Sequence, residues 1–381
     1  MIFYFDNAAT TKINPEVLNE MMPYLTDEYG NPSSLYTIGR NSKKAIDKAR
    51  ERVADLINCN KHEIYFTSCG SESDNTAIKG IAKKYGILEG EQKKNHIITT
   101  KIEHHAILES CKMLEKEGFD VTYLNVDKAG IVNLEELKNA ITEKTILISI
   151  MFANNEIGTI QPIEEISKIT KEKNIIFHTD AVQAVGNIEI DVQKMGIDML
   201  SMSGHKINAP KGIGALYVKK GIQFEKFIHG GHQEKDMRAG TENISGIVGM
   251  GKACELAKNN LDSHETYLKK LRDYYIKEIS KNIKKFRING SMEHRLPGNI
   301  NMCFEGIDGA ALLLELDKKG ICVSSGSACN SSESSPSHVL KAIGLDDKLA
   351  KSAIRVTFGD SNTIAEVDYL VNNIKYILEN V

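Results

Sequence analysis

Two short motifs contain the side chains best suited to chemistry, HTDAVQ at residues 178–183 and SGHK at residues 203–206. Each follows an apolar run typical of a buried strand, and open α/β sheets bind ligands where their parallel strands end. There, Asp180 could pair with a protonated ring nitrogen, and Lys206 could form a Schiff base with a cofactor aldehyde. Taken singly, Asp180 could equally cap a helix and Lys206 could lie at the surface. Their occurrence together at strand ends favours a cofactor site.

A phosphate site is indicated by FTSCGSESDN at residues 66–75, where a strand, a turn of small residues and a helix follow one another. Such a turn leaves backbone N–H groups and the Ser71 hydroxyl at a helix N-terminus, which suits a phosphate monoester. The segment lacks the patterns of a nucleotide P-loop and of a dinucleotide fold. A simpler interpretation, compatible with the first, is a capping box of Ser71 and Asp74.

Two further polar segments also follow predicted strands. EHH at 103–105 offers an imidazole that could stack on a flat cofactor and move protons, although a single histidine is often structural. Asn154 and Asn155 follow the apolar run 146–152 and could donate amide hydrogens to a ring hydroxyl, or could simply form a turn.

One cysteine, Cys329, lies in a loop of small polar residues at 324–337, where an exposed thiol could ionise and reach several partners. The alternative is a bystander thiol. The seven cysteines are scattered without a Cys-x-x-Cys pair, so zinc and dithiol redox motifs are not expected. The others, such as Cys303 in an apolar strand pattern, are expected to be mostly buried free thiols of a reducing cytosol.

The elements that position these residues alternate between apolar runs and amphipathic stretches. The predicted strands of the first block are 64–66, 96–99, 121–124, 146–152, 175–178, 199–202 and 212–218. With helices such as 163–173 between them, they predict a parallel sheet covered on both faces. A long connecting helix is predicted at 245–282. A smaller α/β block follows, with strands at 299–304 and 353–358 and helices at 310–318 and 363–380.

Length and charge limit the class of protein. The 381 residues predict two or three domains at roughly 100–200 residues each. Lys plus Arg number 48 and Asp plus Glu 51, so the net charge is −3, which argues against general binding to nucleic acid or a membrane surface. No apolar run approaches the roughly 20 residues of a membrane helix, and the N-terminus lacks a signal-peptide pattern. We therefore expect a cytoplasmic protein.

Further segments complete a recognisable pattern: YFDNAATT at 4–11, GNPSS at 30–34 and RAGTEN at 238–243. Together with the motifs above and Arg355, they resemble the cysteine desulfurases of the class V aminotransferase group, which use pyridoxal 5′-phosphate (PLP). The resemblance covers nearly the whole chain. The SSGSAC sequence at 324–329 is similar to the group I type, used in nitrogen fixation and general iron–sulfur assembly.

The resemblance implies a role for each matching residue. Lys206 would form the Schiff base, Asp180 would pair with the pyridine nitrogen, and His104 would stack on the ring. The full set implied to hold PLP is Gly70, Ser71, His104, Asn155, Asp180, Gln183, Ser203, His205 and Lys206. Thr241 is similar to the phosphate contact that this family supplies from a second subunit, so a homodimer is implied.

For the reaction, the resemblance implies conversion of L-cysteine to L-alanine and a persulfide on Cys329. Asn31, Asn155 and Arg355 would bind the substrate, and Lys206, His104 and Cys329 would be catalytic. The persulfide sulfur would pass to an acceptor protein such as an iron–sulfur scaffold, whose cluster Cys329 would face transiently. No resident metal, nucleic acid or membrane partner is implied.

The implied fold is the α/β fold type I of PLP-dependent transferases, with a mainly parallel seven-stranded sheet. The implied large domain is 15–260, and the small α/β domain is 1–14 with 261–381, carrying the cysteine loop 324–337. An aminotransferase needs no mobile-loop cysteine, and a catalytically silent scaffold subunit needs no Lys206. The preference between cysteine and selenocysteine and the identity of the acceptor stay open.

Overall fold

The computed structural model describes residues 2–90, 92–325 and 336–380. Its largest sheet has seven strands in the order β2-β8-β7-β6-β5-β3-β4, with β8 antiparallel to both its neighbours and the other pairs parallel. The strands are β2 (Ile64–Thr67), β3 (His96–Thr100), β4 (Asp120–Leu124), β5 (Thr145–Ser149), β6 (Ile176–Asp180), β7 (Met199–Ser203) and β8 (Gly214–Val218). The predicted, mainly parallel seven-stranded sheet is confirmed.

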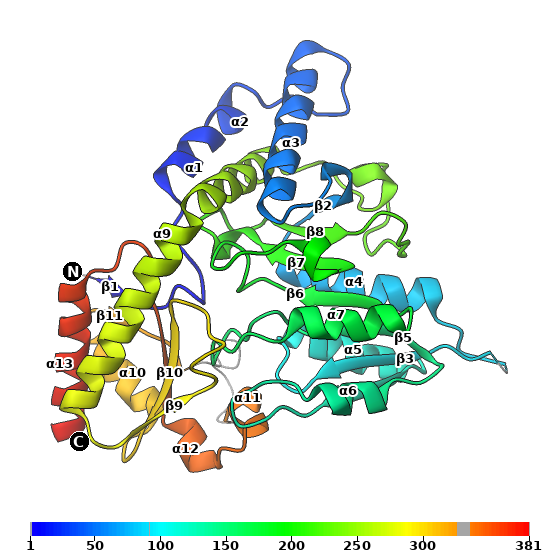
Figure 1. Ribbon diagram of the computed structural model, residues 1–381. Coiled ribbons are helices and arrows are strands. Elements are labelled where there is room, and N and C mark those ends of the chain that lie inside the picture. Colours follow the sequence, from blue (N-terminus) through cyan, green and yellow to red (C-terminus); the bar gives the residue numbers. More distant parts are fainter. Residues whose placement is uncertain (1, 91, 326–335, 381) are drawn as a thin grey trace.

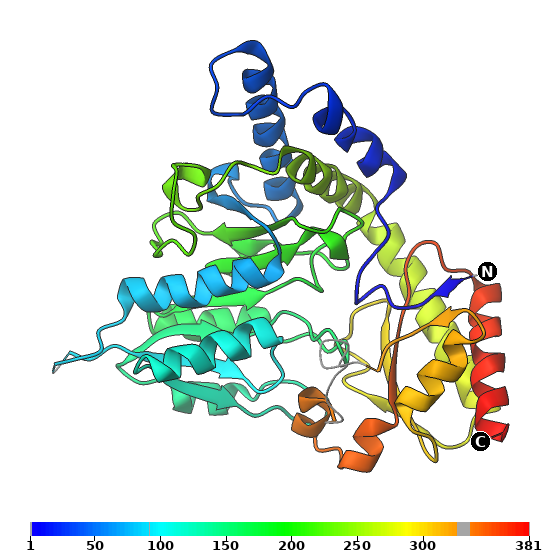
Figure 2. The ribbon, with the colours of Figure 1, turned by 180° about the vertical axis from the view of Figure 1, so that it is seen from behind.

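Helices cover both faces of this sheet because successive strand side chains point to opposite sides. Ile97 and Leu147 pack against α4 (Gly70–Tyr85) and α5 (His105–Lys116). Their neighbours Ile98 and Ile148 pack in a second cluster, on the opposite face. The helices of that face are α3 (Thr37–Leu56), α6 (Leu134–Ala140), α7 (Ile163–Glu172) and the first part of α9 (Ile244–Asn282). Figures 1 and 2 show α7 and α4 on opposite sides of the sheet.

A separate apolar cluster forms around the C-terminal elements. Its sheet has the order β12-β10-β9, all antiparallel. The elements are β9 (Phe286–Asn289), β10 (Asn299–Phe304), β12 (Ala353–Thr357), α10 (Gly309–Asp317) and α13 (Ile364–Asn380). Phe5 packs into this cluster from the start of the chain, next to a short parallel pair of β1 (Phe3–Tyr4) and β11 (Ile321–Cys322).

The long helix α9 joins the two parts of the molecule. Cys254 belongs to the cluster under the large sheet, whereas Leu268 belongs to the C-terminal cluster. Figure 1 shows α9 crossing from one part to the other. The exact domain limits implied by the sequence, 15–260 against 1–14 with 261–381, stay a prediction.

The remaining elements are short or lie at the edge of the molecule. They are α1 (Pro15–Met21), α2 (Pro23–Thr26), α8 (Val192–Met195), α11 (His338–Ala342), α12 (Asp347–Lys351) and the 3-10 turns η1 (Lys61–Glu63), η2 (Gly204–Lys206) and η3 (Glu234–Asp236). The sequence prediction omitted β1, β9 and β11 and extended β5 too far, to residue 152. Within the described chain, no helix combines the length and apolar character needed to cross a membrane.

Candidate active site

The predicted chemistry-bearing motifs meet at the carboxyl edge of the large sheet. Strand β6 ends in Asp180, and β7 ends in Ser203, which is followed by the turn η2 that ends in Lys206. Strand β3 leads to His104, the N-cap of α5. Because these parallel strands are close neighbours in the sheet, their ends place the three motifs side by side.

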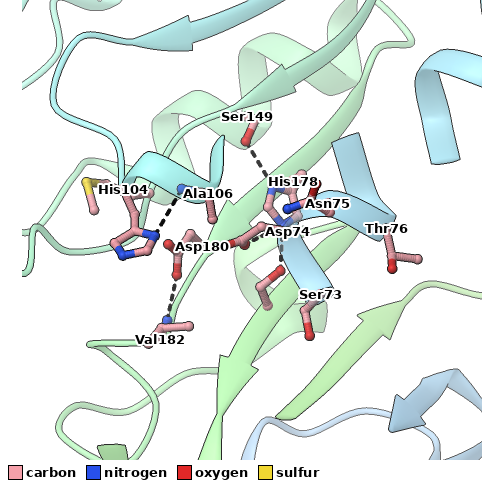
Figure 3. A network of polar contacts seen from close by, with 12 residues as sticks. Ser73, Asp74, Asn75, Thr76, His104, Ala106, Ser149, His178, Asp180 and Val182 are labelled. Carbon is pink, nitrogen blue, oxygen red and sulfur yellow. Dashed lines mark hydrogen bonds and ion pairs between the residues drawn. The ribbon is translucent and has the colours of Figure 1, made fainter. Parts of the chain in front are cut away.

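Asp180 is a buried carboxylate, with only 5% of its surface exposed. Its Oδ1 accepts a hydrogen bond of 2.9 Å from the backbone N–H of Val182. Burial raises the pKa of Asp180, while His104 and Lys206 act in the opposite direction. Figure 3 shows Asp180 lying between His104 and Asp74. A buried carboxylate in this position fits the protonated ring nitrogen of PLP.

The imidazole of His104 has a fixed orientation. Its Nδ1 accepts a hydrogen bond of 3.2 Å from the N–H of Ala106, in the first turn of α5 (Figure 3). Burial lowers the pKa of His104, so the ring is held neutral. A neutral, fixed ring beside Asp180 is suited to stacking on a flat cofactor.

Lys206 contacts the N-terminal segment of the chain. Its Nζ donates to the backbone carbonyls of Ala8 and Ala9, at 2.5 and 2.6 Å. The same Ala8 carbonyl accepts a hydrogen bond of 2.9 Å from Nε2 of Gln183. His205 meets this segment too, because its Nδ1 lies 3.1 Å from the hydroxyl of Thr10. The YFDNAATT segment therefore holds the lysine side chain and its neighbours in place.

The N-terminus of α4 and Ser203 together form a cradle for an anion. The Ser203 hydroxyl is buried and has no hydrogen-bond partner among the described residues. A Cβ built on Gly70 would lie 2.8 Å from Cγ2 of Val182 and 3.9 Å from Oγ of Ser203. A side chain at position 70 would collide with Val182 at this helix N-terminus, so glycine suits a cradle for the phosphate of PLP. His205 lies two residues after Ser203, and burial and Lys206 lower its pKa to about 4.

The capping-box interpretation of this turn is wrong. Helix α4 starts two residues earlier than that pattern needs, with Cys69 as its N-cap and no side-chain capping bond. Ser71 is an exposed residue of the first turn, whereas Asp74 is buried, with 1% exposure, on the side of α4 that faces the sheet. The hydroxyl of Ser71 is thus not used to cap the helix.

Arg355 of β12 is a buried cation with 2% exposure. Its Nη2 pairs with Oδ1 of Asp6 at 2.7 Å, and its Nη1 donates to the backbone carbonyl of Asn155 at 2.9 Å. Its Nε has no hydrogen-bond partner among the described residues. The structure therefore brings two of the predicted substrate residues, Arg355 and Asn155, into contact.

Two other predicted residues do not join this group within one chain. Asn31 lies in the loop between α2 and α3, where its side chain accepts a hydrogen bond from the N–H of Ser33. Thr241 is exposed in the segment between η3 and α9. Within residues 2–90, 92–325 and 336–380, no hydrogen bond or ion pair links either residue to Arg355 or Ser203. Cys329 lies outside the described residues.

The described ends of the cysteine segment are attached to active-site elements. Ser324 pairs through its backbone with Arg355. On the other side, the Ser337 hydroxyl donates to Oε2 of Glu156 at 2.5 Å, and Nε2 of His338 lies 3.0 Å from the backbone carbonyl of Glu103. The first attachment is to Arg355 itself, and the second is to Glu156 and Glu103, which are adjacent in sequence to Asn155 and His104.

Sequence reasoning gave no site role to Asp6 and saw Asp74 only as a possible helix cap. Asp6 lies in the YFDNAATT segment, whose only sequence signal is its match to the family pattern. A signal was available for Asp74, because an acidic residue within an otherwise small and apolar helix face is unusual. Both side chains lie against residues far away in the sequence, so their roles needed the fold.

Comparisons with known proteins agree with this geometry. The Aminotransferase class-V family model matches residues 3–370. A curated relative from Clostridium botulinum, named "Cysteine desulfurase IscS", is 54% identical over 99% of this chain and 94% of its own length. A solved "NIFS-LIKE PROTEIN" is 40% identical and covers 100% of both chains with a TM-score of 0.93. The structure entitled "SspA in complex with cysteine" is 38% identical over 95% of this chain and 100% of its own, with a TM-score of 0.83.

The match extends over nearly the whole chain and includes the strand ends that carry the site. The expected fold, fold type I of the PLP-dependent transferases, and the expected cofactor, PLP, are both supported by these relatives. The chain therefore belongs to the class-V aminotransferase family and, within it, to the PLP-dependent cysteine desulfurases.

Proposed function

We propose that this protein converts L-cysteine to L-alanine and a persulfide on Cys329, and passes that sulfur to an acceptor for iron–sulfur cluster assembly. The observation that carries the proposal is the convergence of Asp180, His104 and Lys206 at one sheet edge, together with the buried cation of Arg355. Arg355 pairs with Asp6 of the same N-terminal segment that Lys206 contacts. Bound PLP supplies an electron sink that makes the Cα–H bond of an amino acid acidic.

The residues of this chain would each make one contribution to that chemistry. Asp180 would accept the hydrogen bond of the ring N–H and keep that nitrogen protonated. His104 would cover one face of the ring. The N–H groups at the start of α4 and the Ser203 hydroxyl would bind the phosphate. The amine of Lys206 would act as the base that accepts the α-proton of the substrate.

Arg355 gives the site its preference for a carboxylate. Its guanidinium is held by Asp6 on one side and by the Asn155 carbonyl on another, while its Nε has no partner among the described residues. An arginine fixed in this way can bind a carboxylate through two parallel N–H groups. A structural neighbour of this chain was solved in complex with cysteine, which supports an amino acid of that size as substrate.

Sulfur transfer needs a thiolate. The Cys329 sulfur would attack the substrate sulfur, the substrate C–S bond would break, and its electron pair would stay on the substrate carbon, which is protonated to alanine. Five of the six described cysteines have a raised thiol pKa, with burial as the first cause, so they are poor nucleophiles: Cys59, Cys111, Cys254, Cys303 and Cys322.

The proposal includes a homodimer in which Thr241 contributes to the phosphate site of the partner subunit. Thr241 is exposed in its own chain, as such a role requires. The reaction needs free thiols, and the six described cysteines are free, which supports a reducing compartment, the cytoplasm.

The test is one turnover of the PLP-loaded protein with L-cysteine, scored for alanine and sulfide and followed by mass-spectrometric mapping of the persulfide. Cys329→Ser should abolish sulfide and persulfide while the cofactor absorption still responds to L-cysteine. Cys69→Ser is the matched control, because Cys69 lies beside the phosphate cradle. Persulfide on Cys69, or full activity of Cys329→Ser, would contradict the proposal. Adding an iron–sulfur scaffold protein should move the persulfide sulfur from Cys329 onto the scaffold.

A further inference from the structure

A second carboxyl group lies behind Asp180, and the proposed reaction does not use it. The ligand atoms of Asp74, His104 and Asp180 all lie within 4.8 Å of one another. Asp74 has 1% exposure, and its Oδ1 has no hydrogen-bond partner among the described residues. A buried, partly unsatisfied carboxyl group beside a catalytic carboxylate calls for an explanation.

A hydrogen-bond chain fixes what surrounds Asp74. The hydroxyl of Ser201 hydrogen-bonds the Asp74 carboxyl group, and its oxygen lies 3.0 Å from Nε2 of His178. The other ring nitrogen, Nδ1, lies 2.9 Å from the hydroxyl of Ser149 (Figure 3). If Ser201 donates to Asp74, Nε2 of His178 must carry the hydrogen and donate to Ser201, while Ser149 donates to Nδ1.

Among the described residues, no positively charged group pairs with Asp74. Nε2 of His178 lies 3.9 Å from Oδ1 of Asp74, but burial lowers the pKa of His178 to about 3, so the ring is neutral. Asp180, Glu103 and Cys69 all raise the pKa of Asp74, and burial is the largest cause. The pKa of Asp180, by contrast, is lowered by the hydrogen bond from the N–H of Val182 and by the nearby His104 and Lys206, which favour its ionised form.

Two buried carboxyl groups at this separation do not both ionise easily. Asp180 has the better environment for a charge, so it takes the ionised form and Asp74 keeps the proton. We propose that Asp74 is a neutral positioning residue, which confines a single negative charge to Asp180, the carboxylate that faces the ring nitrogen. This inference rests on the proposed role of Asp180 toward PLP.

A protonated Asp74 makes the stability of the folded protein depend on pH in a defined direction. The carboxyl of Asp74 has a higher pKa in the folded than in the unfolded chain, where it is about 3.9. Its contribution to stability is therefore complete below that value and declines as the pH rises toward its folded pKa. Asp74→Asn replaces the neutral acid by an isosteric neutral amide, which removes this decline. Its melting temperature relative to wild type should rise by a few degrees between about pH 5 and pH 8.

Asp191→Asn is the matched control. Asp191 caps α8, and the N–H groups of Lys194 and Gln193 help to lower its pKa. It is ionised in both states above about pH 5, so its replacement should change the melting temperature by an amount that does not vary over the same range. His178 titrates equally in wild type and variant, and its contribution cancels in the difference.

A second measurement tests the role toward Asp180 and uses the PLP-loaded protein. In wild type the absorption spectrum of the bound cofactor should have an alkaline step where Asp74 ionises, and Asp74→Asn should lack that step. If Asp74→Asn does not fold, infrared spectra of wild type with ¹³C-labelled aspartate should still show a protonated-carboxyl band at neutral pH.

The outcomes separate this inference from the proposed function. A melting temperature of Asp74→Asn that falls relative to wild type as the pH rises would mean that Asp74 is ionised and paired, and would overturn the inference. Absence of the labelled carboxyl band, or an alkaline step that survives in Asp74→Asn, would overturn it too. Failure of the proposed function would instead appear as absence of sulfide from L-cysteine, which none of these measurements uses.

Discussion

Replacing Glu234 by glutamine should destabilise the protein, because this carboxylate holds a strained turn in place. Glu234, Lys235 and Asp236 have φ values of 45°, 58° and 66°, in the left-handed region, which costs about 1–2 kcal/mol for each residue with a side chain. Nη1 and Nη2 of Arg50 both donate to the Glu234 carboxylate at 2.7 Å, and the N–H of Phe66 donates to it at 2.9 Å.

The size of the loss follows from burial. The side chains of Arg50 and Glu234 are 9% and 4% exposed, and removing one partner of a buried ion pair costs about 3–5 kcal/mol. Glutamine keeps one acceptor for the N–H of Phe66, so we expect a loss of about 3 kcal/mol. The turn is followed by Arg238, which binds Glu72 of α4 at 2.9 Å, and then by Thr241. Because both residues are attached to this turn, retention of the cofactor should weaken as well.

The assay is urea unfolding, with Glu51→Gln as the control. Glu51 pairs with Lys61 at the surface, with side-chain exposures of 52% and 41%, and its loss should cost less than about 1 kcal/mol. The double variant Arg50→Met with Glu234→Gln should lose less than the sum of the single variants, because it leaves no uncompensated charge. A loss below about 1 kcal/mol for Glu234→Gln would refute the reasoning.

Three further predictions concern the site. Lys206→Ala should lose the borohydride-reducible cofactor adduct, and an adduct on another lysine would exclude this assignment. Mixed dimers of Thr241→Ala and Lys206→Ala chains should regain activity, since one of the two sites then has both residues intact; no recovery, or a monomer in sedimentation, counts against the shared site. His178 is neutral when folded, with a pKa of about 3, so stability should fall as the pH drops below its unfolded pKa of about 6.5. As the pH falls from about 6.5 to about 3, the free energy of unfolding measured in urea should drop by about 1.4 kcal/mol more per pH unit in wild type than in His178→Gln. Equal losses in the two proteins would disprove the neutral state of His178.

The sequence located the parts of the site that depend on single strands. Asp180 and Lys206 follow apolar runs directly, so a local pattern and the chemistry of the side chain were enough to place them at a sheet edge. His104 was predicted for the same reason. These residues lie where the pattern indicated, at the ends of β6, β7 and β3.

The parts that the sequence did not reveal depend on contacts between distant segments. Asp6 and Arg355 are 349 residues apart, and no local pattern connects them. β1 and β11 have two residues each, which is too short for a periodic signal. Asp74 was misassigned because a capping box depends on the exact first residue of a helix, and helix ends are the least predictable feature of a sequence.

The pairing of Phe3 with Ile321 has a consequence for how the chain is made. At about 5–20 residues per second, a ribosome needs about 16 to 64 seconds between synthesising these two residues. The strands of the large sheet leave the ribosome during that interval and can pair. The N-terminal segment 4–11, whose carbonyls bind Lys206, still lacks its partner strands β11 and β12 at that stage. Lys206, the proposed Schiff-base lysine, therefore reaches its described surroundings only near the end of translation, so a nascent chain can have a complete large sheet before the proposed site is assembled.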